Sequence, residues 1–256
     1  MNKENQAKII ELVKQAKPLI LQEMTHEKVT EKGAADYVTN VDVAVQNYLK
    51  EALEKEFPEI RLIAEEKENL GLNSRKSYWI LDPIDGTTNL IRDYHLSAVS
   101  LGLYENGEIT FGVVYNPFTE ELFYGAKGEG AYLNGTPIHV SDQQEFKDAV
   151  VSFGSSPYEK NRAKELFPVF YNIFMNCADF RRTGSAALDL CYVACGRQHA
   201  YLEQNLKPWD YSGATVILRE AGGTITDWEN KEPPYLENSD ILACVPQFRD
   251  ILQRLI

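Results

Sequence analysis

Long hydrophobic runs are missing from this sequence, and so are the short motifs of several common enzyme classes. No apolar segment approaches the ~18 residues that a membrane-spanning helix needs, and the opening Met-Asn-Lys-Glu-Asn-Gln lacks the apolar centre of a signal peptide. The sequence contains no Gly-x-x-x-x-Gly-Lys-Ser/Thr, Gly-x-Ser-x-Gly or His-Glu-x-x-His motif. We therefore expect a cytoplasmic protein without membrane contact, and neither a P-loop enzyme, a serine hydrolase nor a zincin.

Cysteine and histidine are scarce as well. The four cysteines form no Cys-x-x-Cys pair, which argues against a zinc knuckle or a thioredoxin-type site. Cys191 and Cys195 lie four residues apart in an expected helix, a pattern typical of small side chains on a buried face. The four histidines are scattered along the chain, so we expect each to be structural.

Positive charge is in the minority, with 26 Lys and Arg against 38 Asp and Glu and a net charge of −12. This balance argues against a broad basic surface, and we expect no direct contact with nucleic acid. An anionic substrate would need local compensation from metal ions or helix N-termini. The 256 residues, 44% of them apolar, suffice for a full-sized core.

Hydrophobic periodicity predicts a mixed α/β or α+β fold built of layers. Helices are expected at residues 4–24 and 41–57, with a polar loop or loose hairpin between them at 25–40. Two short strands should follow at 61–64 and 77–81, and then a meander with strands at 97–104, 109–115 and 121–125 and further short strands to 140. The second half alternates, with strands at 149–153, 179–181, 200–203, 224–226 and 241–244 and helices at 158–175, 184–195, 210–221 and 247–255. We predict one unit of two close-packed lobes, about 1–145 and about 146–256.

The segment 79–89, Trp-Ile-Leu-Asp-Pro-Ile-Asp-Gly-Thr-Thr-Asn, carries the strongest chemical signal. An apolar strand ends at Asp82, Pro83 keeps that residue extended, and Gly86 permits a sharp turn before threonines that can cap a helix. Two carboxylates and free backbone groups in one place suit Mg²⁺ and phosphate. An isolated Asp-x-x-Asp is better explained as ordinary turn chemistry, so the longer string decides.

Five segments, in order along the chain, resemble motifs of the inositol monophosphatase family. They are residues 32–33 with 36–42, residues 64–66, residues 79–89, residues 182–187, and residues 207–214 followed by 220–223. The resemblance extends over essentially the whole chain. It implies the sugar-phosphatase fold, with stacked α, β, α, β and α layers, a magnesium-dependent phosphatase and a homodimer.

The resemblance also implies a role for each matched residue. The metal ligands would be Glu65, Asp82, the carbonyl group of Ile84, Asp85 and Asp210. The catalytic residues would be Asp42 and Thr87, which activate water, and Glu65, which lies beside a third and weaker ion. The substrate contacts would be Gly86, Thr87, Ser185, Ala186 and Glu203. Two or three Mg²⁺ ions are implied, with Mn²⁺ or Ca²⁺ able to substitute in binding, together with inhibition by lithium.

The alcohol part of the substrate stays open at this point. A small phosphate monoester such as inositol 1-phosphate is expected first. Fructose 1,6-bisphosphate, NADP or a 3′-phosphoadenosine compound would need a basic side chain near the metals, from Arg182, Arg197 or Lys207. An interaction protein of the transcription or RNA machinery is the alternative from another class.

Some residues depart from the family pattern without removing a metal ligand. They are Ala64 in place of Gly, Lys67, and residues 90–95, which include Arg92 and His95. Solvated surface side chains are the simpler interpretation of the basic ones, with Lys207 the best candidate to tune the site. The 25–40 loop, which carries Lys32 and Asp36, is expected to close over the metals.

Overall fold

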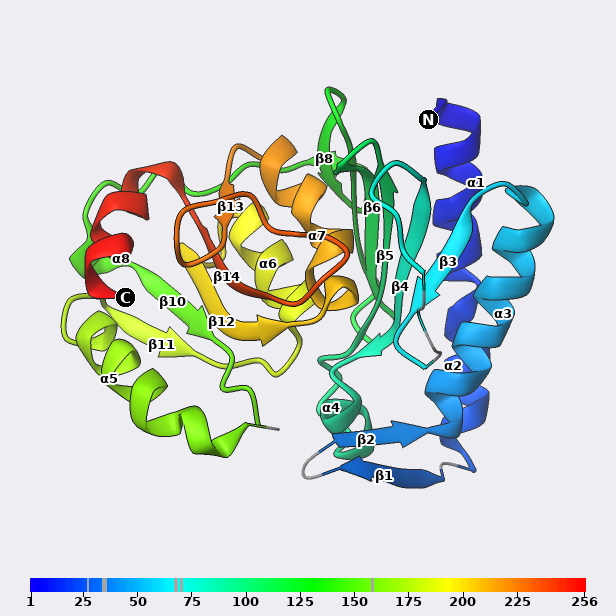
Figure 1. Ribbon diagram of the computed structural model, residues 1–256, viewed down its shortest axis with the longest axis horizontal. Coiled ribbons are helices and arrows are strands. Elements are labelled where there is room, and N and C mark those ends of the chain that lie inside the picture. Colours follow the sequence, from blue (N-terminus) through cyan, green and yellow to red (C-terminus); the bar gives the residue numbers. More distant parts are fainter. Residues whose placement is uncertain (27, 34–35, 67–68, 70, 158) are drawn as a thin grey trace.

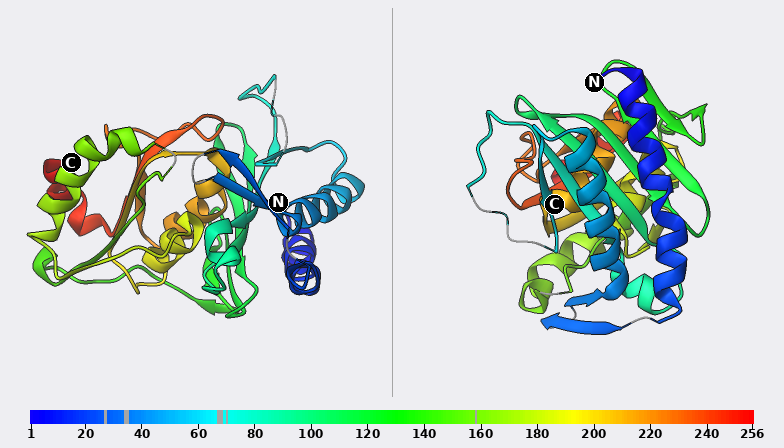
Figure 2. Two further views of the ribbon diagram at one scale, coloured as in Figure 1. Left: turned by 90° about the horizontal axis from the view of Figure 1, so that it is seen from below. Right: turned by 90° about the vertical axis from the view of Figure 1, so that its right-hand side faces the viewer.

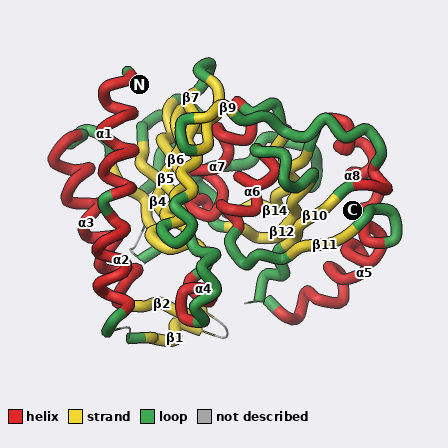
Figure 3. The backbone as a smooth tube through the Cα atoms, turned by 180° about the vertical axis from the view of Figure 1, so that it is seen from behind, coloured by secondary structure: helices red, strands yellow, loops and turns green. Residues whose placement is uncertain are grey.

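The molecule is a stack of five alternating helix and sheet layers, as the computed structural model shows (Figure 1). The structure describes residues 1–26, 28–33, 36–66, 69, 71–157 and 159–256, with the backbone only at Gly33 and Asp36. Three helices form the first layer, a seven-stranded sheet the second, α6 and α7 the third, a five-stranded sheet the fourth, and α5 with α8 the fifth. The view from behind shows the same order (Figure 3). The layered fold predicted from the sequence is confirmed.

The first layer consists of α1, α2 and α3, which cover the outer face of the larger sheet (Figure 2). Their bounds are Lys3–Lys14, Ala16–Met24 and Asn40–Glu56. The prediction of one helix over 4–24 was wrong, because α1 ends at Lys14 and α2 begins at Ala16. Pro18 explains the break, since it has no N–H group and its ring clashes with the carbonyl four residues earlier, at Lys14. The hairpin at 25–40 is formed by β1 (Val29–Gly33) and β2 (Asp36–Thr39).

The larger sheet follows the predicted meander and has the order β3-β4-β5-β6-β7-β8-β9. Its strands are Arg61–Ala64, Tyr78–Asp85, Ala98–Glu105, Glu108–Asn116, Glu121–Ala126, Gly130–Leu133 and Thr136–Pro137. β3 and β4 are parallel and the other neighbours are antiparallel. All eight residues of β4 are buried, because helices cover both faces of the sheet. β4 therefore ends inside the molecule and delivers Asp82 and Asp85 there.

The smaller sheet has the order β11-β10-β12-β14-β13. Its strands are Asp179–Arg181, Val150–Phe153, Ala200–Leu206, Ser239–Cys244 and Thr224–Thr226. The helices of the second half are α5 (Ala163–Phe174), α6 (Ala186–Ala194), α7 (Pro208–Glu220) and α8 (Arg249–Leu255). The helix expected at 158–175 begins later, at Ala163, after a short 3₁₀ turn. The division into two lobes near residue 145 stays a prediction.

Two glycines allow α7 to lie directly on the larger sheet. A Cβ atom at Gly112 of β6 would lie 2.0 Å from the carbonyl oxygen of Gly213 in α7. A Cβ atom at Gly213 would lie 2.5 Å from Ser100 Oγ of β5. No side chain fits at either position, so the helix and sheet backbones are in contact. This contact sets how deeply the first turn of α7 reaches toward β4.

Three apolar clusters fill the spaces between the layers. One lies between α1–α3 and the larger sheet, one around α6 and α7, and one between the smaller sheet and α5 with α8. The last includes Phe170 and Ile173 of α5, which are 4% and 0% exposed. Within the described part of the chain, no helix combines the length and apolar character needed to cross a membrane.

Candidate active site

The end of β4 places two buried carboxylates, Asp82 and Asp85, next to the turn that leads into a short helix, α4 (Thr87–Ile91). Asp82 is 2% and Asp85 7% exposed. The backbone N–H of Ile84 donates to Asp82 Oδ1 at 3.0 Å, which folds the Asp82 side chain back over the turn. Gly86 has φ +89°, and a Cβ atom there would lie 2.9 Å from the Leu96 carbonyl oxygen. The sharp turn proposed from the sequence therefore requires glycine at this position.

Asp42 and Thr87 form the pair predicted to activate water, although 45 residues separate them. Thr87 Oγ1 lies 3.0 Å from Asp42 Oδ1, and the backbone N–H and hydroxyl of Thr39 donate to Asp42 Oδ2 at 2.9 and 2.6 Å. Thr39 and Asp42 together form the capping box that begins α3. Burial raises the pKa of Asp42, and the hydrogen bonds from Thr39 and Thr87 oppose that change. Asp42 is fully buried behind Thr87, so Thr87 is the member of the pair that faces the cavity.

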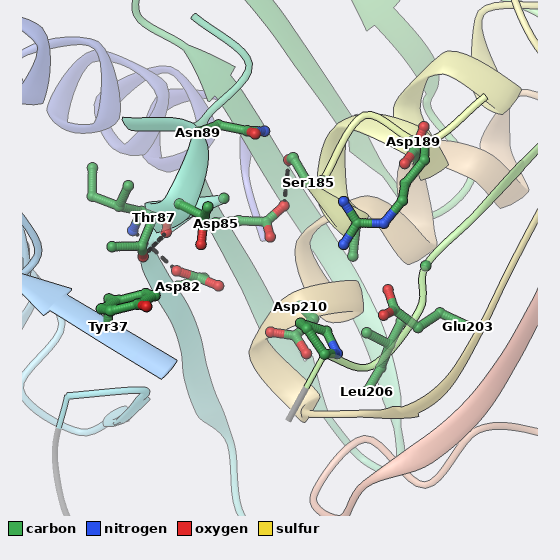
Figure 4. Close-up of a pocket in the computed structure, with 18 of the residues that line it drawn as sticks. Tyr37, Asp82, Asp85, Thr87, Asn89, Ser185, Asp189, Glu203, Leu206 and Asp210 are labelled. Atoms are coloured by element: carbon green, nitrogen blue, oxygen red, sulfur yellow. Dashed lines mark hydrogen bonds between the residues drawn. The ribbon is translucent and has the colours of Figure 1, made fainter. Parts of the chain in front are cut away.

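Four carboxylates gather around the end of β4. Asp82 and Asp85 come from β4, and Asp210 lies in the first turn of α7 (Figure 4). Glu65 directly follows β3. Burial raises the pKa of Glu65 to about 7 and that of Asp85 to about 6. Burial also raises the pKa of Asp82 and Asp210 well above their usual range, with further contributions from neighbouring carboxylates. The structure therefore concentrates negative charge where little water can screen it.

Carboxylate oxygens are the ligands that hard divalent cations prefer, and such cations would offset the negative charge of this cluster. At present each carboxylate is held by protein donors. Asp85 Oδ2 accepts hydrogen bonds from the Ser185 hydroxyl and, at 2.7 Å, from the Ala187 N–H. Asp210 accepts from the Lys207 N–H at 2.7 Å. Among the described residues, no three of these groups already form a finished metal cage.

Lys32 supplies positive charge to this cluster from the β1–β2 hairpin. Its Nζ lies 3.2 Å from Glu65 Oε1 and 2.6 Å from Glu66 Oε1. The ammonium group thus lies beside Glu65, an expected metal ligand. This position agrees with the prediction that the 25–40 loop closes over the metals. The closing motion itself stays a prediction. The side chain of Asp36 and all of Lys67 lie outside the residues that the structure describes.

The expected substrate contacts lie across the cavity from β4. Glu203 of β12 accepts a hydrogen bond at Oε1 from the Ser156 N–H, at 2.9 Å, and one at Oε2 from the Tyr201 hydroxyl, at 2.6 Å. Burial raises the pKa of Glu203, while these two hydrogen bonds and the charge of Arg182 lower it. A Cβ atom at Gly154 would lie 1.7 Å from Glu203 Oε2, so only glycine leaves room for this carboxylate.

A cavity of about 460 Å³ connects the two sides and brings nearly all the predicted site residues together. Those that line it are Glu65, Asp82, Ile84, Asp85, Gly86, Thr87, Ser185, Ala186, Glu203 and Asp210. Of the three basic candidates for a second anionic group, only Arg182 lines the cavity. Arg197 instead forms an ion pair with Glu121 at 2.5 Å. Lys207 is not among the lining residues, and its influence on the site stays a prediction.

Several lining residues had no place in the sequence predictions. They are Tyr37, Asn89, Phe153, Asp189 and Tyr201, together with Arg92, for which the sequence predicts a solvated surface side chain. Ser185 is the N-cap residue of α6, and Asp189 lies four residues further along, so both are at the first turn of this helix. Tyr37 and Asn89 lie within the motif segments 36–42 and 79–89, although neither had an assigned role.

Comparison with known sequences agrees with this geometry. The sequence model of the inositol monophosphatase family matches residues 1–254. The chain belongs to the inositol monophosphatase family. A curated relative, the Nus factor SuhB of Vibrio cholerae, is 37% identical over 227 residues, which are 88% of this chain and 85% of the relative.

Solved structures resemble the chain over nearly its whole length. The Thermotoga maritima IMPase has a TM-score of 0.88 at 30% identity, covering 98% of this chain and 96% of its own. An IMPase/NADP phosphatase complexed with Mg²⁺ and phosphate has a TM-score of 0.90 at 25% identity, covering 99% and 95%. A staphylococcal inositol monophosphatase-1, soaked with LiCl as an inhibitory complex, has a TM-score of 0.91 at 25% identity, covering 99% and 94%.

Proposed function

We propose that this chain is a Mg²⁺-dependent phosphomonoesterase that converts inositol 1-phosphate, or a similar polyol or sugar phosphate, into the alcohol and phosphate. One observation carries the proposal: four carboxylates, of which Asp82 and Asp85 are buried and Glu65 and Asp210 half-buried, converge with the Asp42–Thr87 pair on one cavity. A purely structural role does not explain four acidic groups held together by the fold, because their mutual repulsion destabilises the protein.

The proposed ligands of two or three ions are Glu65, Asp82, the Ile84 carbonyl, Asp85 and Asp210, and Mn²⁺ or Ca²⁺ can replace Mg²⁺ in binding. When bound, Mg²⁺ neutralises phosphate oxygens, lowers the pKa of water and stabilises the leaving alkoxide. The backbone N–H groups of Gly86 and Thr87, at the start of α4, are proposed to hold the phosphate.

The Asp42–Thr87 pair is proposed to take the proton of the attacking water. As the water oxygen bonds to phosphorus, its proton passes to Thr87 Oγ1 and the Thr87 hydroxyl proton passes to Asp42. The 3.0 Å distance between Thr87 Oγ1 and Asp42 Oδ1 supports this transfer. The ester P–O bond breaks on the opposite side, and the alkoxide becomes the alcohol when it takes a proton from solvent.

Glu203 is proposed to accept a hydrogen bond from a substrate hydroxyl, with Ser185 and Ala186 beside it. Each Glu203 oxygen already accepts one hydrogen bond and keeps a second lone pair for the substrate. Arg182 and Arg92, which line the same cavity, favour the alternative substrates that carry a second phosphate, such as fructose 1,6-bisphosphate, NADP or a 3′-phosphoadenosine compound.

Phosphate release from this panel of substrates, with Mg²⁺ present, tests the proposal. We expect turnover of at least one monoester, its inhibition by lithium, and its loss in Asp210→Asn. Arg182→Gln should lower the rate on bisphosphates alone if the alternative substrates are correct. Normal turnover by purified Asp210→Asn would contradict the assignment of the metal site.

A role in the transcription machinery is a second candidate, favoured by the relatives named Nus factor SuhB. The net charge of −12 speaks for a protein partner rather than direct RNA binding. Affinity capture from a cell extract distinguishes the two: recovery of transcription proteins with both wild type and Asp210→Asn would support this role independently of catalysis. Recovery of the chain alone would speak against it.

A homodimer is proposed as well, with α5 and β11 as its contact. Phe167, Tyr171 and Met175 of this region are 56%, 64% and 62% exposed, and β11 is an edge strand beside them. Antiparallel pairing of two copies of β11 would set Asp179 of one copy opposite Arg181 of the other. Sedimentation should show a dimer that Tyr171→Glu dissociates, and an unchanged dimer would rule this contact out. Cytoplasmic localisation stays a prediction.

A further inference from the structure

Another buried carboxylate, Asp189, lies beside the site and has no part in the proposed chemistry. It belongs to α6, lines the cavity and is 2% exposed (Figure 4). Its Oδ2 accepts a hydrogen bond from Thr183 Oγ1 at 2.8 Å, and its Oδ1 accepts one from Gln198 Nε2 at 3.1 Å. Burial of a charged group is unfavourable unless it is well paired, so these bonds indicate a defined task.

From Asp189 a chain of hydrogen bonds leads to an expected metal ligand. The Thr183 hydroxyl has one proton, and the shorter of its contacts commits that proton to Asp189. A Thr183 lone pair is then turned toward the Ser185 N–H, which donates to it at 3.2 Å. Ser185 in turn donates its hydroxyl to Asp85 Oδ2. Three consecutive bonds thus connect Asp189 with Asp85.

The turn that carries this chain is fixed from its other side by Asn89 of α4. Asn89 Nδ2 donates to the Thr183 carbonyl at 2.8 Å and to the Leu96 carbonyl at 2.7 Å. Between Thr183 and Ser185, Gly184 has φ +87°, a conformation that other residues rarely adopt. The backbone is therefore restrained on both sides, and the hydrogen bond to Asp189 is the shortest contact that orients the Thr183 hydroxyl.

We infer that Asp189 is a positioning residue, which acts through Thr183 and Ser185 to hold the Asp85 carboxylate in the orientation that binds metal. The inference rests on the proposed metal-dependent function. It assigns Asp189 no contact with the reacting atoms. A purely structural Asp189, which only joins α6 to Gln198, would stabilise the protein without affecting its affinity for metal.

Direct Mg²⁺ binding, measured by titration calorimetry, separates the two roles. We expect Asp189→Ala and Thr183→Val to weaken Mg²⁺ binding by about tenfold or more, the range found when partners of metal ligands are removed. The Mg²⁺ concentration for half-maximal phosphate release should rise by the same factor. Thr183→Ser keeps the hydroxyl and should bind Mg²⁺ like the wild type. The double variant should be no weaker than either single variant, because both changes break one chain.

Thr110→Val is the matched control. Thr110 Oγ1 donates to Glu105 Oε2 at 2.6 Å, the same kind of contact, and neither residue lines the cavity. This variant should lose stability in urea as Thr183→Val does, yet bind Mg²⁺ normally.

The inference would be overturned if Thr183→Val bound Mg²⁺ with wild-type affinity, whatever the stability of that variant. It would also be overturned if Thr183→Ser lowered the Mg²⁺ affinity as much as Thr183→Val does. This pair decides the question even if Asp189→Ala does not fold. Failure of the proposed function looks different, because the wild-type protein itself would then bind no Mg²⁺. Additive losses in the double variant would also count against a shared chain.

Discussion

Removal of metal should make this protein less stable as the pH rises, and Asp85→Asn should reverse part of that loss. The raised pKa values of Glu65 and Asp85, about 7 and about 6, mean that the folded protein holds protons that the unfolded chain releases. Stability from these groups is fully present below about pH 4 and is lost as the pH rises to about 7. Differences from the ordinary values of 4.5 and 3.8 correspond to about 3 kcal/mol for each group taken alone.

Asp85→Asn removes one negative charge and keeps the shape of the side chain. Its amide oxygen can still accept the hydrogen bonds of Ser185 and Ala187 that Asp85 accepts now. In EDTA at pH 7.5, we expect Asp85→Asn to be more stable than the wild type by about 1–3 kcal/mol. Mg²⁺ should stabilise the wild type more at pH 7.5 than at pH 5, because protonated carboxylates do not bind metal. It should stabilise Asp85→Asn much less than the wild type.

Urea unfolding followed by circular dichroism, at several pH values between 4 and 8, measures these free energies of unfolding. Glu108→Gln is the control, because Glu108 is a partly exposed carboxylate that pairs with Lys127 at the surface. It should show no gain in stability at high pH. The reasoning is refuted if metal-free Asp85→Asn is less stable than the wild type at pH 7.5, or if wild-type stability in EDTA does not fall between pH 5 and pH 7.5.

Three further predictions concern close contacts around the site. Gly112→Ala should lower the free energy of unfolding by about 1–3 kcal/mol, because its Cβ would lie 2.0 Å from the Gly213 carbonyl, and urea unfolding measures this. Gly154→Ala should raise KM with a smaller effect on kcat, because its Cβ displaces Glu203; an unchanged KM would show that Glu203 does not contact the substrate. Thr87→Ala should lower kcat by about 10²–10⁴ while Mg²⁺ binding by calorimetry stays normal, and a normal kcat would exclude Thr87 from proton transfer.

Local parts of the site could be predicted from the sequence because neighbouring residues determine them. The run from Asp82 to Thr87 forms a turn that depends on Gly86 and on the preceding apolar strand, and all of these are adjacent in the chain. Pro18 also gave a local signal for the break between α1 and α2, which the apolar periodicity of residues 4–24 obscured. Helix periodicity reports burial, and it does not detect a missing backbone hydrogen bond.

Long-range parts of the site depended on family resemblance or were missed. Asp42 and Thr87 meet although 45 residues apart, and nothing local in either segment indicates the other. The sequence does not distinguish Arg182 from Arg197 as a partner for a second anionic group. In the structure, Arg182 lines the cavity, whereas Arg197 pairs with Glu121 outside it. In the sequence, Asp189 cannot be distinguished from the other 37 acidic residues. Its proposed role depends on the orientation of the Thr183 hydroxyl, which only the folded structure shows. Side-chain partners of this kind are set by tertiary packing.

The position of Asp210 relative to Asp82 follows from backbone contact rather than from the acidic residues themselves. Asp82 pairs with Ser100 across β4 and β5, and a Cβ atom at Gly213 would lie 2.5 Å from Ser100 Oγ. Asp210 precedes Gly213 by three residues, less than one helical turn, so the contact at Gly213 fixes how near Asp210 comes to β4. The glycine of the second family signature therefore controls the spacing of the proposed metal ligands Asp82 and Asp210, although it has no ligand atom of its own.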